Sequence, residues 1–279
     1  PVHLGAMPVS VEAALGEVGA LDPGDVVILN DPFRGGTHLP DITLISAVFA
    51  QQGASRDAGI GEASPLLLGY VASRAHHSDV GGMSPGSMPL AREIFQEGLR
   101  IPPVLLYRHG VRNQELWSTL LANVRTPVER SGDLDAQLAA LHTGSVRLLE
   151  MVDRRGPAEV LEAMQGLIGY ADRLVEEGIR RIPDGRYQAE DLMDDDGFGA
   201  RDLPIRLAME VAGDRMILDF EGTAPQAQGG INAVAAITAS ACRYVVRCMV
   251  EALLETPLPA GGGSMAAVEL RLPPRSLVN

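Results

Sequence analysis

The residues best suited to chemistry lie in a loop between two apolar runs near the start of the chain. The first run, Val26 to Leu29, has the length and β-branched content of a short buried strand, and Ile42 to Phe49 is a second such run. Between them His38 and Asp41 stand three residues apart in the sequence His-Leu-Pro-Asp. An imidazole and a carboxylate together suit a divalent cation such as zinc, manganese or iron. The alternative is that both side chains hydrogen-bond to the backbone of their own glycine-rich loop.

A second loop has the same make-up. The apolar run Leu66 to Ser73 is followed by His76, His77 and Asp79, and then by the turn Gly81-Gly82. If the strands that precede the two loops are neighbours, these groups can converge on one metal ion. A catalytic metal site needs about three protein ligands and one open position. The competing interpretation is that the histidines satisfy backbone groups of the loops.

Four arginines lie nearest to these loops: Arg34, Arg74, Arg100 and Arg125. Any of them could hold a carboxylate of a substrate through two parallel hydrogen bonds, and Arg34 and Arg74 are the first candidates. In so negative a chain, pairing with neighbouring acidic residues is an equally good explanation for all four.

Other motifs of the chain do not support the chemistry that they first suggest. Asp194 to Gly197 lacks the closing glutamate of a calcium-binding EF-hand loop, so we expect an exposed acidic turn. Gly261 to Ser264 lacks the lysine of a phosphate-binding loop, so any ATP is expected to bind to another polypeptide. Cys242 and Cys248 lie in an apolar run and are expected to be buried, reduced thiols.

Composition excludes several classes of function. The chain has 279 residues, of which 46% are hydrophobic and 21% charged, as in an ordinary globular protein. A net charge of −13 with no basic cluster argues against nucleic-acid binding. The apolar run Ala233 to Leu254 contains three charged residues and is expected to be a core helix, not a membrane span. The cytoplasm is the expected compartment. The first and last residues of the chain suggest a segment of a longer polypeptide.

The order of the patterns predicts an α+β fold with mixed sheets, a helical middle section and metal-site loops at strand ends. Residues 1–113 are expected to form a strand-rich segment, residues 114–184 a helical segment, and residues 185–279 an α+β segment. We expect the three segments to form one intertwined catalytic unit, truncated at both ends.

Several stretches of the chain resemble the hydantoinase B/5-oxoprolinase family, which includes the alpha subunit of acetone carboxylase. The resemblance spans nearly the whole chain and is carried by long, specific motifs. The motifs are Pro1 to Pro8, Asn30 to Asp41, Ser73 to Asp79, Glu93 to Pro103, Leu121 to Pro127 and Gly229 to Ala233.

The resemblance implies one component of an ATP-dependent hydrolase of cyclic amides such as 5-oxoproline or hydantoins. It also implies a hetero-oligomer, with ATP and magnesium bound by a hydantoinase A-like partner. The implied metal ligands are His38, Asp41 and His76, with a further carboxylate upstream of residue 1. His77 or Asp79 would then orient a ligand or move a proton. Two alternatives stay open: an ATP-dependent ketone carboxylase of the acetone type, and a non-catalytic scaffold subunit.

Overall fold

The computed structural model describes residues 3, 5–51, 65–86, 89–260 and 265–279. These residues form two compact units. One, the histidine unit, consists of Ser10–Ser87 and Gly98–Ala163. The other, the C-terminal unit, consists of Pro1–Val9, Met88–Glu97 and Met164–Asn279.

The histidine unit is built on a five-stranded antiparallel sheet in the order β3-β2-β1-β4-β5. Its strands are β1 (Val26–Leu29), β2 (Asp41–Ala50), β3 (Leu66–His76), β4 (Val104–Arg108) and β5 (Val111–Arg112). Its helices are α1 (Met7–Val18, which begins in the C-terminal unit), α3 (Gln114–Ala122) and α4 (Pro127–Arg155). The strand β3 is therefore an edge strand, with the histidine pair at its end.

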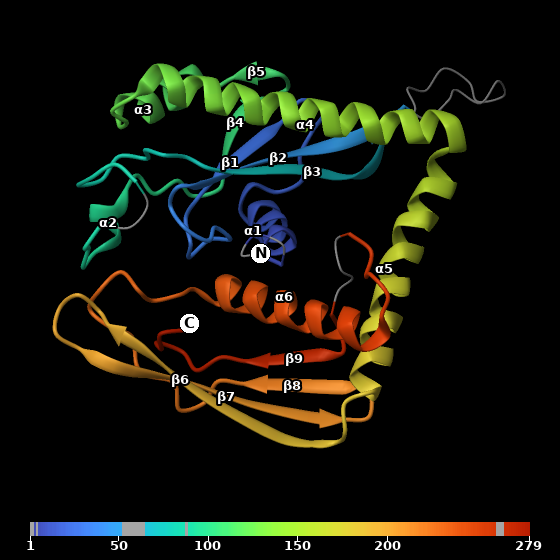
Figure 1. The fold of residues 1–279 in the computed structure, drawn as a ribbon. Helices are drawn as coiled ribbons and strands as arrows, with labels where there is room; N and C mark the ends of the chain where they lie inside the picture. The colour runs from blue at the N-terminus through green and yellow to red at the C-terminus, as the bar shows by residue number, and fades with distance from the viewer. Residues whose placement is uncertain (1–2, 4, 52–64, 87–88, 261–264) are drawn as a thin grey trace. The chain divides into compact units, whose positions relative to one another are not determined.

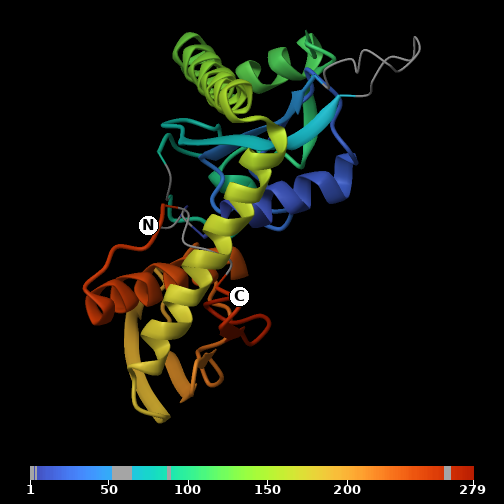
Figure 2. The same ribbon diagram turned by 90° about the vertical axis from the view of Figure 1, so that its right-hand side faces the viewer.

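Helices cover the two faces of this sheet, with α1 on one face and α4 on the other (Figures 1 and 2). On the α1 face, Ala14 packs among apolar residues of the strands, including Ile45 and Ala72. On the α4 face, Val152 packs against Val48. Burial of these apolar side chains is the main force that holds both helices on the sheet.

The helix boundaries follow their sequence signals. Asn113 caps α3 by accepting a hydrogen bond from the Leu116 backbone N–H at 3.0 Å. Gly156 ends α4 with a φ of 82°, which favours glycine. The next helix, α5 (Pro157–Arg180), begins with a proline, as its sequence predicts.

The C-terminal unit contains a four-stranded sheet in the order β6-β7-β8-β9, whose last pair is parallel. The strands are β6 (Gly185–Asp195), β7 (Arg201–Ala212), β8 (Arg215–Asp219) and β9 (Val268–Arg271), and the helices are α2 (Ile94–Glu97), most of α5, and α6 (Ala235–Leu254). The core of this unit joins Val250 of α6 and Ile179 of α5 to Met216 and Leu218 of β8.

This architecture confirms the predicted α+β fold with mixed sheets. The division into three consecutive segments stays a prediction. The helix α2 is a single turn, and β4 begins only after Pro102-Pro103, whose nitrogens cannot donate to a sheet. The stretch Gly261 to Ser264 and the motif residues Pro1, Val2 and Leu4 lie outside the described residues. None of the described helices is both long and apolar enough to cross a bilayer.

The expectation of buried thiols is wrong: Cys248 is exposed, and Cys242 is only half-buried. The acidic turn is exposed at Asp194, Asp195 and Gly197, as expected, but Asp196 within it is buried, with 4% of its surface exposed. Its Oδ1 accepts the backbone N–H groups of Phe198 at 2.8 Å and Ala200 at 3.0 Å, which explains how a carboxylate can be buried there.

Candidate metal centre

The loop between β1 and β2 is held in place by a buried asparagine. The side-chain amide of Asn30 donates to the backbone oxygens of Leu39 at 2.7 Å and Leu99 at 2.9 Å. Its Oδ1 accepts the N–H of Ile101 at 2.6 Å. A single fully buried side chain thus ties the two ends of the loop together, which is the support that a metal site on a loop requires.

The two glycines of the loop have different reasons to be glycine. Gly35 has a φ of 88°, a conformation that side chains rarely adopt. At Gly36, a Cβ atom would lie 2.2 Å from the backbone oxygen of Asn30, because the loop folds back on its own start. Such a contact is impossible without moving the loop, so Gly36 permits the tight turn that brings His38 back towards the sheet.

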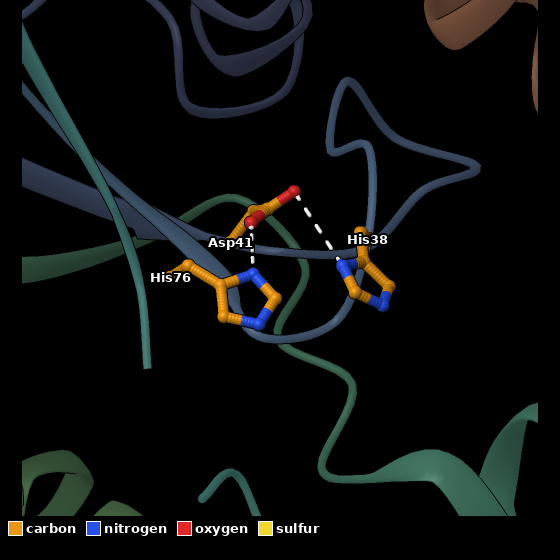
Figure 3. A group of neighbouring side chains, drawn as sticks. All are labelled: His38, Asp41 and His76. Atoms are coloured by element: carbon orange, nitrogen blue, oxygen red, sulfur yellow. Dashed lines mark hydrogen bonds and ion pairs between the residues drawn. The ribbon is translucent and has the colours of Figure 1, made fainter. Parts of the chain in front are cut away.

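Three side chains converge at the ends of β2 and β3 (Figure 3). Asp41 is the first residue of β2 and is the Cα partner of His76, the last residue of β3. The His76 Nδ1 lies 2.9 Å from Asp41 Oδ1, and the His38 Nδ1 lies 3.8 Å from Asp41 Oδ2. The two imidazole rings are 5.2 Å apart, with the carboxylate between them.

This group fits a divalent metal ion. One atom from each of the three side chains can be chosen so that all lie within 4.8 Å of one another. The set of two nitrogens and one carboxylate suits zinc, manganese or iron. Asp41 is buried, with 3% of its side chain exposed, whereas 45% of the His76 side chain is exposed. The three potential ligands therefore leave an accessible side, as a catalytic metal site requires.

Neighbouring groups hold the buried Asp41 carboxylate in place. The Thr37 hydroxyl donates to Asp41 Oδ2 at 3.0 Å. The carbonyl oxygen of Pro40 accepts the backbone N–H of His77 at 2.8 Å, which joins the loop to the end of β3. Contacts of this kind fix the orientation of metal ligands and tune their affinity.

A cleft of about 270 Å³ lies between the end of β3 and α4. Its lining belongs mostly to the α4 face of the sheet, to which His77 points, whereas Asp41 and His76 face the other side; His76, at the end of β3, is the residue that the cleft and the metal group have in common. Half of the lining residues are small; the lining residues other than His76 are Ser73, Ala75, His77, Asp133, Ala136, Gln137 and Ala140.

His77 does not join the metal group. Because side chains alternate along a strand, His77 points to the face opposite that of His76. It is buried, and its Nε2 lies 2.9 Å from the Oε1 of Gln137 on α4. Burial lowers the pKa of His77, although the bond to Gln137 acts in the other direction, so its ring is neutral at pH 7. These contacts describe a histidine that anchors α4 to the sheet.

Asp79 also lies away from the metal group. Its carboxylate accepts the backbone N–H groups of Gly81 and Arg125, and the Arg125 guanidinium lies 2.8 Å from Oδ1. Burial alone would raise the pKa of Asp79, but these hydrogen bonds outweigh it and hold the pKa below its usual value. The carboxylate joins the second glycine loop to the start of α4.

The candidate arginines have different surroundings. Arg34 is exposed and lies 3.1 Å from Glu17, and Arg100 lies 3.4 Å from Asp31. With Arg125, these arginines pair with neighbouring acids, the second of the two explanations considered for them. Arg74 differs: its Nε donates to the Thr43 hydroxyl at 2.8 Å, and its Nη2 to the Ser10 hydroxyl at 2.5 Å.

Sequence reasoning missed three residues that support the site. Ser10, Thr37 and Gln137 are ordinary polar residues, and only Thr37 had a local clue, since it directly precedes His38 in the loop. The contacts of Ser10 and Gln137 depend on which helix covers which face of the sheet, which no short motif reveals.

The fold and the site define a class of protein: an α+β chain whose neighbouring strands end in a group of two histidines and an aspartate. A model of the hydantoinase B/oxoprolinase family matches residues 1–279. The chain belongs to this family. It is 32% identical to the 5-oxoprolinase of Saccharomyces cerevisiae over 296 residues, which cover 100% of this chain and 21% of the yeast protein. It is 34% identical to the beta subunit of the caprolactamase of Pseudomonas jessenii over 237 residues, which cover 84% of this chain and 38% of that protein.

Solved structures share the fold. The ATP-dependent caprolactamase of Pseudomonas jessenii matches with a TM-score of 0.85 and 30% identity, over 100% of this chain and 46% of that one. Nucleotide-free acetone carboxylase matches with a TM-score of 0.79 and 20% identity, over 100% of this chain and 37% of that one, which shows the common fold. The chain spans from about a fifth to about half of the length of its curated relatives.

Proposed function

We propose that the chain forms part of the metal-dependent component of an ATP-dependent hydrolase that opens cyclic amides. The observation that carries this proposal is the convergence of His38, Asp41 and His76, with the His76 side chain accessible to solvent. Membership of the hydantoinase B/oxoprolinase family supports the reaction class, because relatives are named 5-oxoprolinase and caprolactamase.

The three side chains would hold the metal, and Asp41 has the central role because its two oxygens face the two histidines. A divalent metal bound there would supply Lewis acidity and lower the pKa of a water molecule to near neutrality. Thr37 keeps the Asp41 carboxylate in position through its hydrogen bond to Oδ2. The exposed side of His76 leaves the substrate a direct approach from solvent.

We place the substrate at the exposed side of His76, where the metal group is open to solvent. Arg34 stays the candidate for contacting a charged substituent of the substrate, since it is exposed and carried by the same loop as His38. His77 and Asp79 stay candidates for supporting roles, through their positions at the end of β3 and in the loop that follows.

We propose that ATP is bound by a second, hydantoinase A-like protein in a complex with this one. Two relatives are themselves named as single components of larger enzymes, one of a hydantoinase and one of caprolactamase, and their names support such a complex. ATP used by the second protein would activate the amide carbonyl, which is otherwise a poor electrophile. The complex is expected in the cytoplasm.

Metal content and activity of the complex test this function. The full-length protein would be purified with its ATP-binding partner and analysed by elemental mass spectrometry, alongside His38→Ala, Asp41→Ala and the control His142→Ala. His142 is an exposed histidine of α4 outside the metal group. We expect near-stoichiometric metal in the wild type and the control, and its loss in the other two variants.

The same preparations would then be assayed for ATP hydrolysis that depends on 5-oxoproline, hydantoin or caprolactam. Turnover of any of them that disappears with His38→Ala supports the proposal. Turnover only with acetone and bicarbonate would replace it by ketone carboxylation. A wild-type complex without metal would overturn it in favour of a scaffold role.

A further inference from the structure

Arg74 lies directly behind two of the proposed metal ligands. On the α1 face, consecutive cross-strand pairs of β2 and β3 are Ala47 with Tyr70, Ile45 with Ala72, Thr43 with Arg74, and Asp41 with His76. The pairs change from apolar to polar towards the strand ends. Arg74 thus lies between the apolar core and the metal group, on the same face of the sheet as both.

Hydrogen bonds from Arg74 reach the parts that carry the ligands. Its Nε donates to the Thr43 hydroxyl, which itself donates to the backbone oxygen of Asp41 at 3.3 Å. Its Nη2 donates to the Ser10 hydroxyl, which donates to the backbone oxygen of Gly35. One planar guanidinium therefore links β2, β3, α1 and the glycine turn that precedes His38. Ser10 is fully buried, so this link is shielded from water.

We propose that Arg74 is a positioning residue for the metal site, which holds the His38 loop and the Asp41 strand in register through Ser10 and Thr43. The inference rests on the proposed metal site. It makes Arg74 a structural partner of the ligands, where sequence reasoning suggested contact with a substrate.

The direction in which metal affinity changes when Arg74 is replaced distinguishes a positioning role from a purely electrostatic effect of its charge. A guanidinium near a divalent cation repels it, and Asp41 is the acid whose charge acts on Arg74. If charge alone mattered, removal of the Arg74 charge would make metal binding tighter. If Arg74 positions the ligands, its removal makes metal binding weaker. Loss of a residue that orients metal ligands typically lowers metal affinity by about 10–100-fold.

Cobalt binding to the metal-free, full-length protein shows whether metal affinity rises or falls. Co²⁺ would be titrated into wild type, Arg74→Met, Arg74→Lys and Ser10→Ala, with both the dissociation constant and the visible absorption spectrum recorded. We expect Arg74→Met and Arg74→Lys to weaken binding by about 10–100-fold and to change the spectrum. Lysine keeps the charge but cannot donate to both hydroxyls in the fixed geometry of a guanidinium, so it should not rescue binding.

A control variant, Arg112→Met, and the Ser10→Ala variant make the result decisive. Arg112→Met removes a cation from β5, at the opposite edge of the same sheet, and is expected to leave Co²⁺ binding unchanged. Ser10→Ala alters little volume and removes the link from Arg74 to Gly35 while leaving the bond from Arg74 to Thr43, so it tests the proposal even if the Arg74 variants unfold. We expect it to weaken binding by about 10-fold.

Wild-type affinity and spectrum in Ser10→Ala and Arg74→Lys would overturn the inference, as would tighter binding in Arg74→Met. These outcomes leave the metal site itself intact. Absence of Co²⁺ binding by the wild type would overturn the proposed metal site and the inference with it.

Discussion

Asp41 and His76 are directly opposed residues of two antiparallel strands, and their side chains meet at 2.9 Å. Opposed residues of such strands keep their Cβ atoms about 4.5–5.5 Å apart, so the backbone of the sheet already brings this pair together. His38 has no such support and depends on the fold of its loop. In the candidate site, strand pairing thus fixes Asp41 and His76, whereas the glycine turn and its partners fix His38.

Replacement of Gly36 by alanine tests whether the glycine turn positions His38. The added Cβ would lie 2.2 Å from the Asn30 oxygen, so the loop has to move. We expect Gly36→Ala to lower the free energy of unfolding by about 2 kcal/mol or more and to weaken metal binding. Urea unfolding and Co²⁺ titration measure the two effects.

Gly16→Ala is the matched control for this substitution. Gly16 lies in α1, and a Cβ there would meet nothing within 4 Å. Alanine is the better helix former by about 1 kcal/mol, so the control should be neutral or stabilising. Equal behaviour of the two variants would show that the turn tolerates a side chain and that its tight geometry does not position His38.

Thr37→Val removes the hydroxyl that donates to Asp41 Oδ2 and keeps the shape of the side chain. Asp41 would lose a fixed orientation, and we expect metal affinity to fall by about 10–100-fold. The free energy of unfolding should fall by only about 1–3 kcal/mol, the range for a buried hydrogen bond that loses one partner. Thr37→Ser retains the donor and should restore metal affinity towards that of the wild type. If valine and serine had the same effect, the hydroxyl would have no role in holding the ligand.

The sequence predicted the meeting of the two loops but not the way in which they meet. Both loops follow apolar strands and carry the same residue types. The strands that precede them, β1 and β3, are not neighbours; the loops meet because β2, which follows the first loop, pairs with β3. Which of His76 and His77 faces Asp41 depends on the register of β2 with β3, because one residue of shift exchanges the two faces. Register is set by long-range packing, and therefore the buried, α4-bound position of His77 could not be read from its neighbours in the chain.

The two cysteines should differ in reactivity. Cys248 is exposed, whereas burial raises the pKa of the half-buried Cys242 to about 11. The thiolate is the reactive form, so at pH 8 about one in a thousand molecules carries an ionised Cys242. We expect iodoacetamide to modify Cys248 first, as mapped by peptide mass spectrometry, and Cys248→Ser to react slowly. Rapid labelling of Cys242 in that variant would show that the α6 packing described here is wrong.

Asp79 predicts a specific dependence of stability on pH. The folded protein holds the pKa of Asp79 below its usual value, because the hydrogen bonds from Arg125 and Gly81 outweigh burial. A carboxyl group with a lowered pKa in the folded state contributes stability above its unfolded pKa of about 3.9, and this contribution is lost as the pH falls through the folded pKa. We therefore expect Asp79→Asn to lower the free energy of unfolding at pH 7 by about 2–4 kcal/mol.

The difference between Asp79→Asn and wild type should shrink as the pH falls below about 4, because the wild-type carboxyl group then takes up its proton as well. Urea unfolding between pH 7 and pH 3 measures this convergence. Asp133→Asn serves as the control, since Asp133 is half-exposed in an ion pair with Arg130 and should change stability by no more than about 1 kcal/mol. A difference for Asp79→Asn that stayed constant down to pH 3 would mean that its cost comes from packing and not from the charge of the carboxylate.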